Sequence, residues 1–462
     1  MPGEPFEIRY WSKLGGINNS LSDEFIVTDS ELSDGRNFQP DEQTSGVLIK
    51  REGTVRTSSA IGANITSIYQ GANGNYFTVP QFIYNFSGTG LTGALGLSTY
   101  YPSWTTMAVY DIMADGVQVM KTSNGTTFTA LAGVPGGTRY VCSVNNFLYA
   151  SGGDGHLRWA NIGTAETWPT TNDLTLTADT ADNITGLAPW RNAVFVGSAK
   201  SFRLVTGYTS LEQAVSYYSK EEGCLSHRSI VVTPMGLMWW SRRGATVLRE
   251  EMTLDFPMQR KLQGTLYGLN RAMDGSVHAV HDPTRKRVMF FLFNGVSTTC
   301  SLRADYFYYD DAWYLHDAAG VRMNSSGSAL ISGVVDVYAG GYGATNGYLF
   351  KYSGATDDGV FINSWLETAR EAYGSSAVLK IGRKASISTD LTTPETILYG
   401  VYVDNATILT DTYSIAVVAG GVDTRIGVNR AHYKIKHMIS DTATSRTRIY
   451  GIKHDGYVVK TV

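Results

Sequence analysis

Three short β-type runs within residues 222–249 constrain the fold of this chain more than any other part of its sequence. The runs are 229–233, 237–241 and 245–249, and the connector between each pair contains a glycine. In the first connector, Pro234 fixes φ at one corner of a turn and Gly236 accepts the positive φ of the next, so the chain reverses without strain. Two such reversals in succession predict an antiparallel meander.

The apolar residues of this meander occupy both faces of its strands. Residues 237–240 are Leu, Met, Trp and Trp, with no polar residue between them. Because successive strand residues point to opposite faces, such a sheet needs apolar neighbours on both sides, as stacked sheets provide. We expect Trp239 and Trp240 to point one toward each neighbouring sheet, and Gly223 and Cys224 to mark the start of the unit.

Similar units recur along the chain at a regular interval. The equivalent positions of the clear copies are Phe147, Val194, Leu237, Val288 and Val337. They are 47, 43, 51 and 49 residues apart, and looser copies lie near Ile65 and Trp104. A period of about 40–50 residues with several strands in each unit is typical of β-propeller blades. We therefore expect an all-β protein whose residues 55–356 form a β-propeller of about six blades.

The segments before and after the repeats have a different texture. Residues 1–54 are polar and broken by Gly, Asn and Pro, and we interpret them as an extended N-terminal arm with strands only at 24–28 and 47–50. Residues 357–462 carry about five strand-like runs at irregular spacing, which predicts a β-sandwich-like C-terminal platform domain. Residues 353–359 would form the linker before it. The one segment in which we expect a short helix is 209–220.

The charge of the chain argues against a surface that grips nucleic acid. The 462 residues carry a formal net charge of −3. Phosphate affinity scales with the cations that a protein presents, and the sequence holds no cationic cluster. The charge is unevenly spread, because residues 1–50 carry −5 and residues 374–462 carry +4. Ends of opposite charge suit an assembly in which the end of one subunit contacts the flank of the next. A solvated acidic arm gives the same charge pattern.

The cysteines and the hydropathy pattern indicate a reducing compartment. Cys142, Cys224 and Cys300 are far apart, odd in number and flanked by apolar strand-like residues, so we expect buried free thiols. The start of the sequence lacks a basic region followed by an apolar run, and no stretch approaches the roughly 18 apolar residues that cross a bilayer. We expect no export signal and no membrane insertion.

The spacing of the reactive residues matches no known catalytic device. The motifs HExxH, paired CxxC, GxSxG and GxxxxGK[ST] are all absent, which removes the usual support for zinc, dithiol, serine-elbow and phosphate-loop chemistry. His278 and His281 have no third ligand candidate beside them, so we interpret them as strand-end histidines rather than metal ligands. Two adjacent carboxylate pairs point to opposite strand faces and suit turns better than glycoside cleavage. These pairs are Asp310 with Asp311 and Asp357 with Asp358. We expect no enzyme activity, metal or cofactor.

The aromatic run near residue 306 is the strongest candidate for a contact surface. Tyr306 and Tyr308 share one strand face, and Trp313 follows shortly after. Tyrosine buries its ring while its hydroxyl stays hydrogen-bonded, so such strands form a core between blades or a subunit contact. Stacking on sugar rings is the alternative. We take Tyr306, Tyr308 and Trp313 as candidate interface aromatics.

The segment 221–249 also carries a family resemblance. Its order is a Gly-Cys element, an Arg-Ser pair, an apolar strand and a Ser-containing turn with Gly. That order resembles part of the tail nozzle proteins of short-tailed bacteriophages, which are also called tail hub or tubular proteins. The matching positions are Gly223, Cys224, Arg228, Ser229, Ser241 and Gly244. Upstream, Gly197 lies in a segment similar to the "strand, Gly-Ser, strand, Thr-Gly" stretch that precedes this element in the family.

The N-terminal stretch is similar to the same family, in which a Gly-Gly-x-Asn start leads to a Leu-x-x-Arg-x-Gly element. The matching positions are Gly15, Gly16, Asn18, Leu48, Arg51 and Gly53. The family often shows Arg-Pro-Gly in this element. Glu52 replaces the proline here, so we expect a looser turn at that point.

The resemblance implies a structural virion protein. Members of the family form a homohexameric tube at the distal end of the tail, dock on an adaptor above and carry fibres or tailspikes at the flank. Double-stranded DNA passes through the channel without specific binding. The protein would be assembled in the bacterial host cytoplasm and reside in the virion tail. Two alternatives stay open at this point: a glycan-binding or glycan-cleaving propeller for host attachment, and a minor tail protein of a long-tailed phage.

Overall fold

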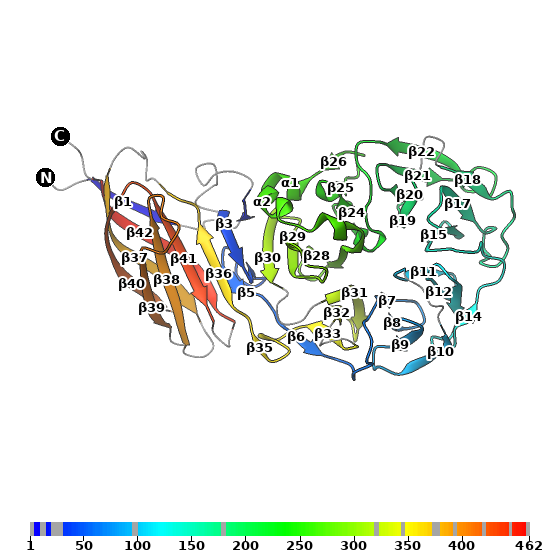
Figure 1. The fold of residues 1–462 in the computed structure, drawn as a ribbon, viewed down its shortest axis with the longest axis horizontal. Coiled ribbons are helices and arrows are strands. Elements are labelled where there is room, and N and C mark those ends of the chain that lie inside the picture. The colour runs from blue at the N-terminus through cyan, green and yellow to red at the C-terminus, as the bar shows by residue number, and fades with distance from the viewer. Residues whose placement is uncertain are drawn as a thin grey trace.

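The structure of the protein, a computed structural model, is built almost entirely of β-strands. It describes residues 4–9, 15–19, 31–94, 100–176, 182–317, 323–342, 347–371, 379–390, 395–417, 422–442 and 446–458. Figure 1 shows a ring of small sheets on one side and an elongated pair of sheets on the other, with both chain ends at the far end of the pair. The all-β propeller fold predicted from the sequence is confirmed.

Six four-stranded sheets follow one another along the chain as antiparallel meanders. Blades one to three are β7 (Ser67–Gln70), β8 (Asn75–Val79), β9 (Phe82–Asn85) and β10 (Gly90–Ala94); β11 (Ser103–Met107), β12 (Tyr110–Ala114), β13 (Val119–Thr122) and β14 (Thr129–Ala130); and β15 (Tyr140–Val144), β16 (Phe147–Ser151), β17 (His156–Trp159) and β18 (Asp173–Thr175). Blades four to six are β19 (Ile184–Trp190), β20 (Ala193–Ser198), β21 (Phe202–Thr206) and β22 (Ala214–Ser219); β23 (Val231–Thr233), β24 (Gly236–Ser241), β25 (Gly244–Leu248) and β26 (Leu254–Asp255); and β27 (His278–Asp282), β28 (Arg287–Leu292), β29 (Leu302–Phe307) and β30 (Ala312–Asp317).

A seventh blade closes the ring with a strand from the N-terminal part of the chain. Its sheet runs β31 (Met323–Ile331), β32 (Val334–Gly341), β33 (Leu349–Tyr352), β6 (Thr54–Arg56), β34 (Thr356–Asp357) and β35 (Val360–Phe361). The strand β6 pairs antiparallel with β33 and parallel with β34. The described residues thus form seven blades, one more than the expected number. The loose copies near Ile65 and Trp104 are two separate blades, and Trp104 lies on a first strand rather than the second.

The two tryptophans of the opening meander occupy the predicted positions. Trp239 packs toward blade four, with its ring centroid 4.9 Å from that of Phe195. Trp240 packs toward blade six, 6.1 Å from the ring of Phe290. The turns on either side use the predicted glycines, with φ of 143° at Gly236 and 88° at Gly244. Apolar residues on both faces of β24 are therefore explained by its position between two blades.

The remaining strands form two six-stranded sheets that pack against each other. One contains β4 (Phe38–Pro40), β5 (Leu48–Lys50), β42 (Arg448–Val458), β37 (Lys380–Asp390) and β40 (Val422–His432), with β1 (Glu4–Arg9) paired to β42. The other runs β2 (Gly16–Ile17), β3 (Glu31–Arg36), β36 (Ser364–Thr368), β41 (Ile435–Asp441), β38 (Glu395–Val403) and β39 (Asp411–Val417). Buried isoleucines from both sheets, including Ile387 and Ile439, fill the space between them.

The N-terminal residues belong to this sandwich, so the interpretation of residues 1–54 as an extended arm does not describe the structure. The short strands β3 and β5 pair with β36 and β42, which follow several hundred residues later. Local sequence gives little sign of a strand whose partner is that far away. The expected strand at 47–50 is present as β5, whereas the one expected at 24–28 lies outside the described residues.

Two local expectations were wrong. Residues 209–220 contain the strand β22 rather than a helix, because this segment pairs with β21 at the outer edge of its blade. Residues 353–359 are not a free linker, since β34 lies within the seventh sheet. The helices that the structure describes are α1 (Pro257–Lys261), α2 (Gln263–Tyr267) and the 3-10 turns η2 (His227–Ser229) and η3 (Arg271–Ser276). No helix among the described residues is long and apolar enough to cross a membrane.

Candidate functional site

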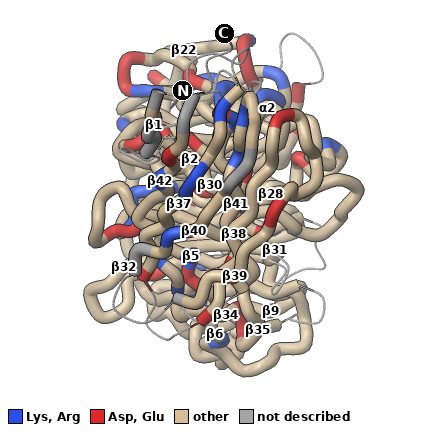
Figure 2. The backbone as a smooth tube through the Cα atoms, turned by 90° about the vertical axis from the view of Figure 1, so that its left-hand side faces the viewer, with Lys and Arg blue, Asp and Glu red and all other residues tan. Residues whose placement is uncertain are grey.

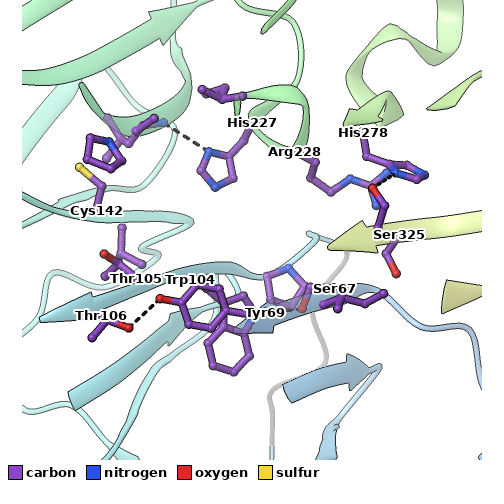
Figure 3. Close-up of a pocket in the computed structure, with 18 of the residues that line it drawn as sticks. Ser67, Tyr69, Trp104, Thr105, Thr106, Cys142, His227, Arg228, His278 and Ser325 are labelled. Carbon is purple, nitrogen blue, oxygen red and sulfur yellow. Dashed lines mark hydrogen bonds between the residues drawn. The ribbon is translucent and has the colours of Figure 1, made fainter. Parts of the chain in front are cut away.

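A cavity lies at the centre of the propeller, between the first strands of the blades. It has a volume of about 470 Å³. Figure 3 shows side chains from several blades converging on it. One wall is aromatic, since the rings of Tyr69 and Trp104 stack with centroids 5.1 Å apart. The Trp104 indole donates to Ser67 Oγ at 2.9 Å, and the Tyr69 hydroxyl lies 2.8 Å from Thr106 Oγ1.

The opposite wall of this central cavity carries its basic residues. Arg228 and His227 come from η2, and His278 begins β27. The Leu187 amide donates to His227 Nδ1 at 3.4 Å, and His278 Nδ1 lies 2.8 Å from Ser326 Oγ. Burial, and then the charge of Arg228, lower the pKa of His227 to about 4, so its imidazole is neutral at pH 7. Burial also lowers the pKa of His278 well below its ordinary value, so the cavity presents the Arg228 cation and two neutral imidazoles at pH 7.

The Arg228 side chain ties η2 to η3 and to the first strand of blade seven. Its Nη1 donates to the Asn324 carbonyl at 2.7 Å and its Nη2 to the Ser276 carbonyl at 2.5 Å. The guanidinium carbon lies 3.4 Å from the centroid of the Tyr101 ring. Burial lowers the pKa of Arg228 to about 10, which leaves the group charged at pH 7. Among the described residues, no carboxylate forms an ion pair with it.

The second notable site is a buried ionic network where the N-terminal segment meets blade six. Arg287 is fully buried and donates to Asp305 at 2.7 Å, to Asp282 at 3.1 Å and to Glu52. Its Nη1 also donates to Gln39 Oε1 at 3.1 Å. Glu52, where the resembled family often has a proline, is thus buried in an ion pair with Arg287. The charge of Arg287 opposes burial and holds the pKa of Glu52 well below its ordinary value.

The N-terminal motif residues lie in joints between distant parts of the chain. Arg51 binds Asp357 with two nitrogens, one of them at 2.9 Å, and donates to Asn37 Oδ1 at 2.9 Å. A Cβ on Gly53 would lie 2.0 Å from the Thr356 carbonyl oxygen. These contacts fasten the segment that leaves the sandwich to the closing strands of blade seven.

The earlier part of this motif contacts blade six and its neighbouring helix. Gly16 has φ of 76°, and a Cβ there would lie 2.6 Å from backbone atoms of Trp313. The Gly15 carbonyl accepts from Lys261 Nζ at 3.1 Å. Asn18 Nδ2 donates to Glu31 Oε2 at 2.9 Å. Leu48 is fully buried in the core of the sandwich.

The second motif joins blades four and five. A Cβ on Gly197 would lie 2.6 Å from Cys224 Cβ, and one on Gly223 would lie 2.4 Å from the Ala199 carbonyl. The Cys224 amide donates to the Ser198 carbonyl at 2.8 Å. Ser229 Oγ accepts from the Trp240 amide at 2.9 Å. Gly223 and Cys224 thus mark the start of blade five, as expected.

The candidate interface aromatics lie inside the protein rather than on its surface. Tyr306, Tyr308 and Trp313 are 3%, 4% and 0% exposed. The Tyr306 and Trp313 rings stack with centroids 4.7 Å apart, and the Tyr306 hydroxyl donates to Asp311 at 2.9 Å. Their assignment to a subunit contact or to sugar stacking is wrong, because these side chains are covered by the protein's own core. The strand pattern could not distinguish a core from an interface.

The remaining polar candidates have structural partners. His281 Nε2 lies 3.2 Å from the Tyr308 hydroxyl, and Asp358 pairs with Arg56. Asp311 pairs with Arg260 at 2.9 Å. Within the described ranges, no group of three or more His, Cys, Asp or Glu residues could hold a metal ion. All three cysteines are buried and unpaired, which confirms the expectation of buried free thiols.

The two oppositely charged ends of the chain meet within the sandwich. Arg448 Nε lies 3.0 Å from Asp41 Oδ2. Figure 2 shows Lys and Arg residues along β37 and β40 in the sheet that also contains the N-terminal strands. At this point an acidic residue of the N-terminal part and a basic residue of the C-terminal part pair within one chain.

Comparisons with known proteins give only distant structural likeness. No protein-family profile matches the sequence, and no curated protein matches it. Among solved structures, a chain of the mitotic checkpoint complex is 13% identical with a TM-score of 0.43, covering 66% of this chain and 95% of that one. The WD40 propeller domain of Doa1 is 9% identical with a TM-score of 0.41, covering 66% and 97%. The computationally designed Ika8 protein is 10% identical with a TM-score of 0.40, covering 64% and 99%. The fold assignment here rests on the strand order of the sheets.

Proposed function

We propose that this chain is a structural virion protein that forms the homohexameric distal nozzle of a phage tail. In this role it completes the channel through which DNA leaves, docks on the tail adaptor and carries fibres or tailspikes at its flank. The protein is assembled in the bacterial cytoplasm and resides in the virion tail.

The observation that carries the proposal is the position of the motif residues. Gly16, Gly53 and Gly223 each leave no room for a Cβ against backbone from another segment. Arg51 and Cys224 are buried in joints between elements. The positions that carry the family resemblance therefore hold an architecture together, as a structural protein requires, and none of them forms a reactive constellation.

The connectivity supports a mechanical role. The N-terminal segment passes through the sandwich and then supplies β6 to blade seven, while the C-terminal strand β42 pairs with both β1 and β5. Strands held on both sides by partners distant in sequence cannot separate without opening a whole sheet. A channel wall under the pressure of passing DNA benefits from such closure.

The charge of the protein supports passage of DNA without specific binding. Many cations of the described residues lie in ion pairs, such as Arg448 with Asp41 and Arg260 with Asp311, and the net charge is −3. Cations already neutralised by carboxylates release few counterions from DNA, so affinity stays low. We expect no retardation of double-stranded DNA at physiological salt in a gel-shift assay.

Contacts between subunits need surfaces other than the buried aromatic strand. The exposed large apolar side chains of the described residues include Val296, Leu211 and Tyr267, which are 96%, 93% and 80% exposed. They lie near β28, β22 and α2, on the propeller half of the molecule. An obligate ring contact is expected to bury about 2,000 Å² or more with apolar residues at its centre.

Electron microscopy of the purified full-length protein tests the proposal. We expect class averages with six-fold rings and a central opening. The Val296→Asp and Leu211→Asp variants test whether these exposed side chains contribute, and Arg242→Gln, at an exposed turn, is the matched control. A wild-type protein that stays a monodisperse monomer at high concentration in both low and moderate salt would contradict the nozzle.

A further inference from the structure

The central cavity of the propeller has an unbalanced charge. Its basic lining residues are Arg228, His227 and His278, and none of its described lining residues is an aspartate or a glutamate. Its polar wall otherwise consists of hydroxyl groups, among them Ser326 and Thr105. By contrast, the fully buried Arg287 is paired with three carboxylates. No carboxylate among the described lining residues therefore offsets the charge of Arg228.

The Arg228 guanidinium has donors to spare. Hydrogen bonds to the carbonyls of Asn324 and Ser276 use two of its five N–H groups, and each of the two terminal nitrogens keeps a second N–H. A charged group taken out of water without a carboxylate costs free energy. An anion entering the cavity offsets that cost, because a charge-assisted hydrogen bond is stronger than a neutral one.

His227 adds a neutral donor to the same wall. Its Nδ1 accepts from the Leu187 amide, so the proton of the neutral imidazole is on Nε2. Figure 3 shows its ring projecting from η2 toward the opposite strands, while the Arg228 side chain extends toward His278 and Ser325. Donors from η2 thus face a cavity whose far wall is the stacked pair of Tyr69 and Trp104.

We propose that the central cavity binds a small molecule through an oxyanion group, a carboxylate or a phosphate, with Arg228 as its anchor. The volume of about 470 Å³ falls within the range of small-molecule pockets, which combine apolar walls with a few converging polar groups. The aromatic wall of Tyr69 and Trp104 accommodates the apolar remainder of the ligand. The site is independent of the nozzle function.

Calorimetric titration of the full chain tests this site, with inorganic phosphate and benzoate as the two probes and sodium chloride holding the ionic strength constant. We expect saturable binding of at least one probe, with one site per chain. Preference for phosphate identifies a phosphate-type ligand, and preference for benzoate an aromatic carboxylate. If neither phosphate nor benzoate binds, the proposal is overturned.

Three variants separate binding from folding. Arg228→Gln removes the anchor, and we expect at least a ten-fold loss of affinity. Because Arg228 also ties η2 to its neighbours, the second test is Ser143→Phe, which adds bulk to the cavity wall on β15 and should abolish binding. Arg242→Gln should bind like the wild type. A folded Arg228→Gln protein with wild-type affinity, or a folded Ser143→Phe protein that still binds, refutes the site.

Discussion

Replacing Glu52 by glutamine removes one charge from the network around Arg287. Arg287 is fully buried and pairs with Glu52, Asp282 and Asp305. Breaking a buried pair by removing one partner costs about 3–5 kcal/mol, because the other charge stays buried. Two carboxylates remain beside Arg287 in the variant, so we expect a loss at the lower end, about 3 kcal/mol of the free energy of unfolding.

The opposite substitution should cost more. Arg287→Met leaves Glu52 without its principal partner, whereas Asp305 keeps Arg303 at 2.9 Å and Asp282 keeps Arg285 at 3.3 Å. We expect a loss of about 5 kcal/mol. The double variant should lose less than the sum of the two single losses, because the second substitution removes a charge that the first has already stranded.

Urea unfolding followed by circular dichroism measures these differences. The control is Glu250→Gln, which breaks the exposed pair between Arg191 and Glu250 and should change the stability by less than about 1 kcal/mol. If Glu52→Gln changes stability no more than Glu250→Gln does, Glu52 is solvated. The account of the junction between the N-terminal segment and blade six would then be wrong.

Three further predictions concern packing, pH and thiol chemistry. Gly53→Ala places a Cβ 2.0 Å from the Thr356 carbonyl oxygen and should lower the free energy of unfolding in urea by about 3 kcal/mol. The control is Gly136→Ala, which has open space around it and should leave the stability unchanged. Equal effects of the two substitutions would contradict the tight packing at Gly53. Burial lowers the pKa of His227 and His316 to about 4 and that of His454 to about 3. Because the ordinary histidine pKa is about 6.5, the unfolded chain binds more protons than the folded chain once the pH falls below that value. Each histidine should therefore remove about 2 kcal/mol of stability between pH 7 and pH 5, and a urea midpoint that stays constant over this range would refute it. Burial raises the pKa of Cys224 and Cys300 to about 12 and that of Cys142 still further, so the native protein should not react with Ellman's reagent until denaturant exposes all three thiols. Fast reaction of the folded chain would contradict their burial.

The propeller could be predicted from the sequence because its signals are local. Each blade is a meander whose turns and apolar runs lie within one repeat, and the interval between Phe147, Val194 and Leu237 is visible without any partner. The orientations of Trp239 and Trp240 follow from the alternation of side chains along a strand. The count of blades failed where the repeat was weakest, in the first two copies.

The sandwich was only half predicted, because half of it comes from the other end of the chain. The strand β5 pairs with β42, which lies about 400 residues further along. The same distance hid the partner of Glu52, since Arg287 follows 235 residues later. Local sequence marks polar residues but does not indicate which of them become buried pairs.

The central cavity was not visible in the sequence at all. Its wall takes a few residues from most blades, and Arg228 had been noted only as part of a motif. Tyr306 and Trp313 illustrate the converse, because an aromatic strand has the same pattern in a core as in an interface. Only the structure shows that Arg228 lines a cavity and that Tyr306 and Trp313 are buried.

The proposed nozzle function is tested most directly by a reconstruction of virus particles in which this chain is detected by mass spectrometry. We expect six copies of the propeller and sandwich around the channel at the distal end of a tail. A reconstruction in which the distal channel wall has another fold, or in which this fold occupies a single copy away from the channel, would contradict it.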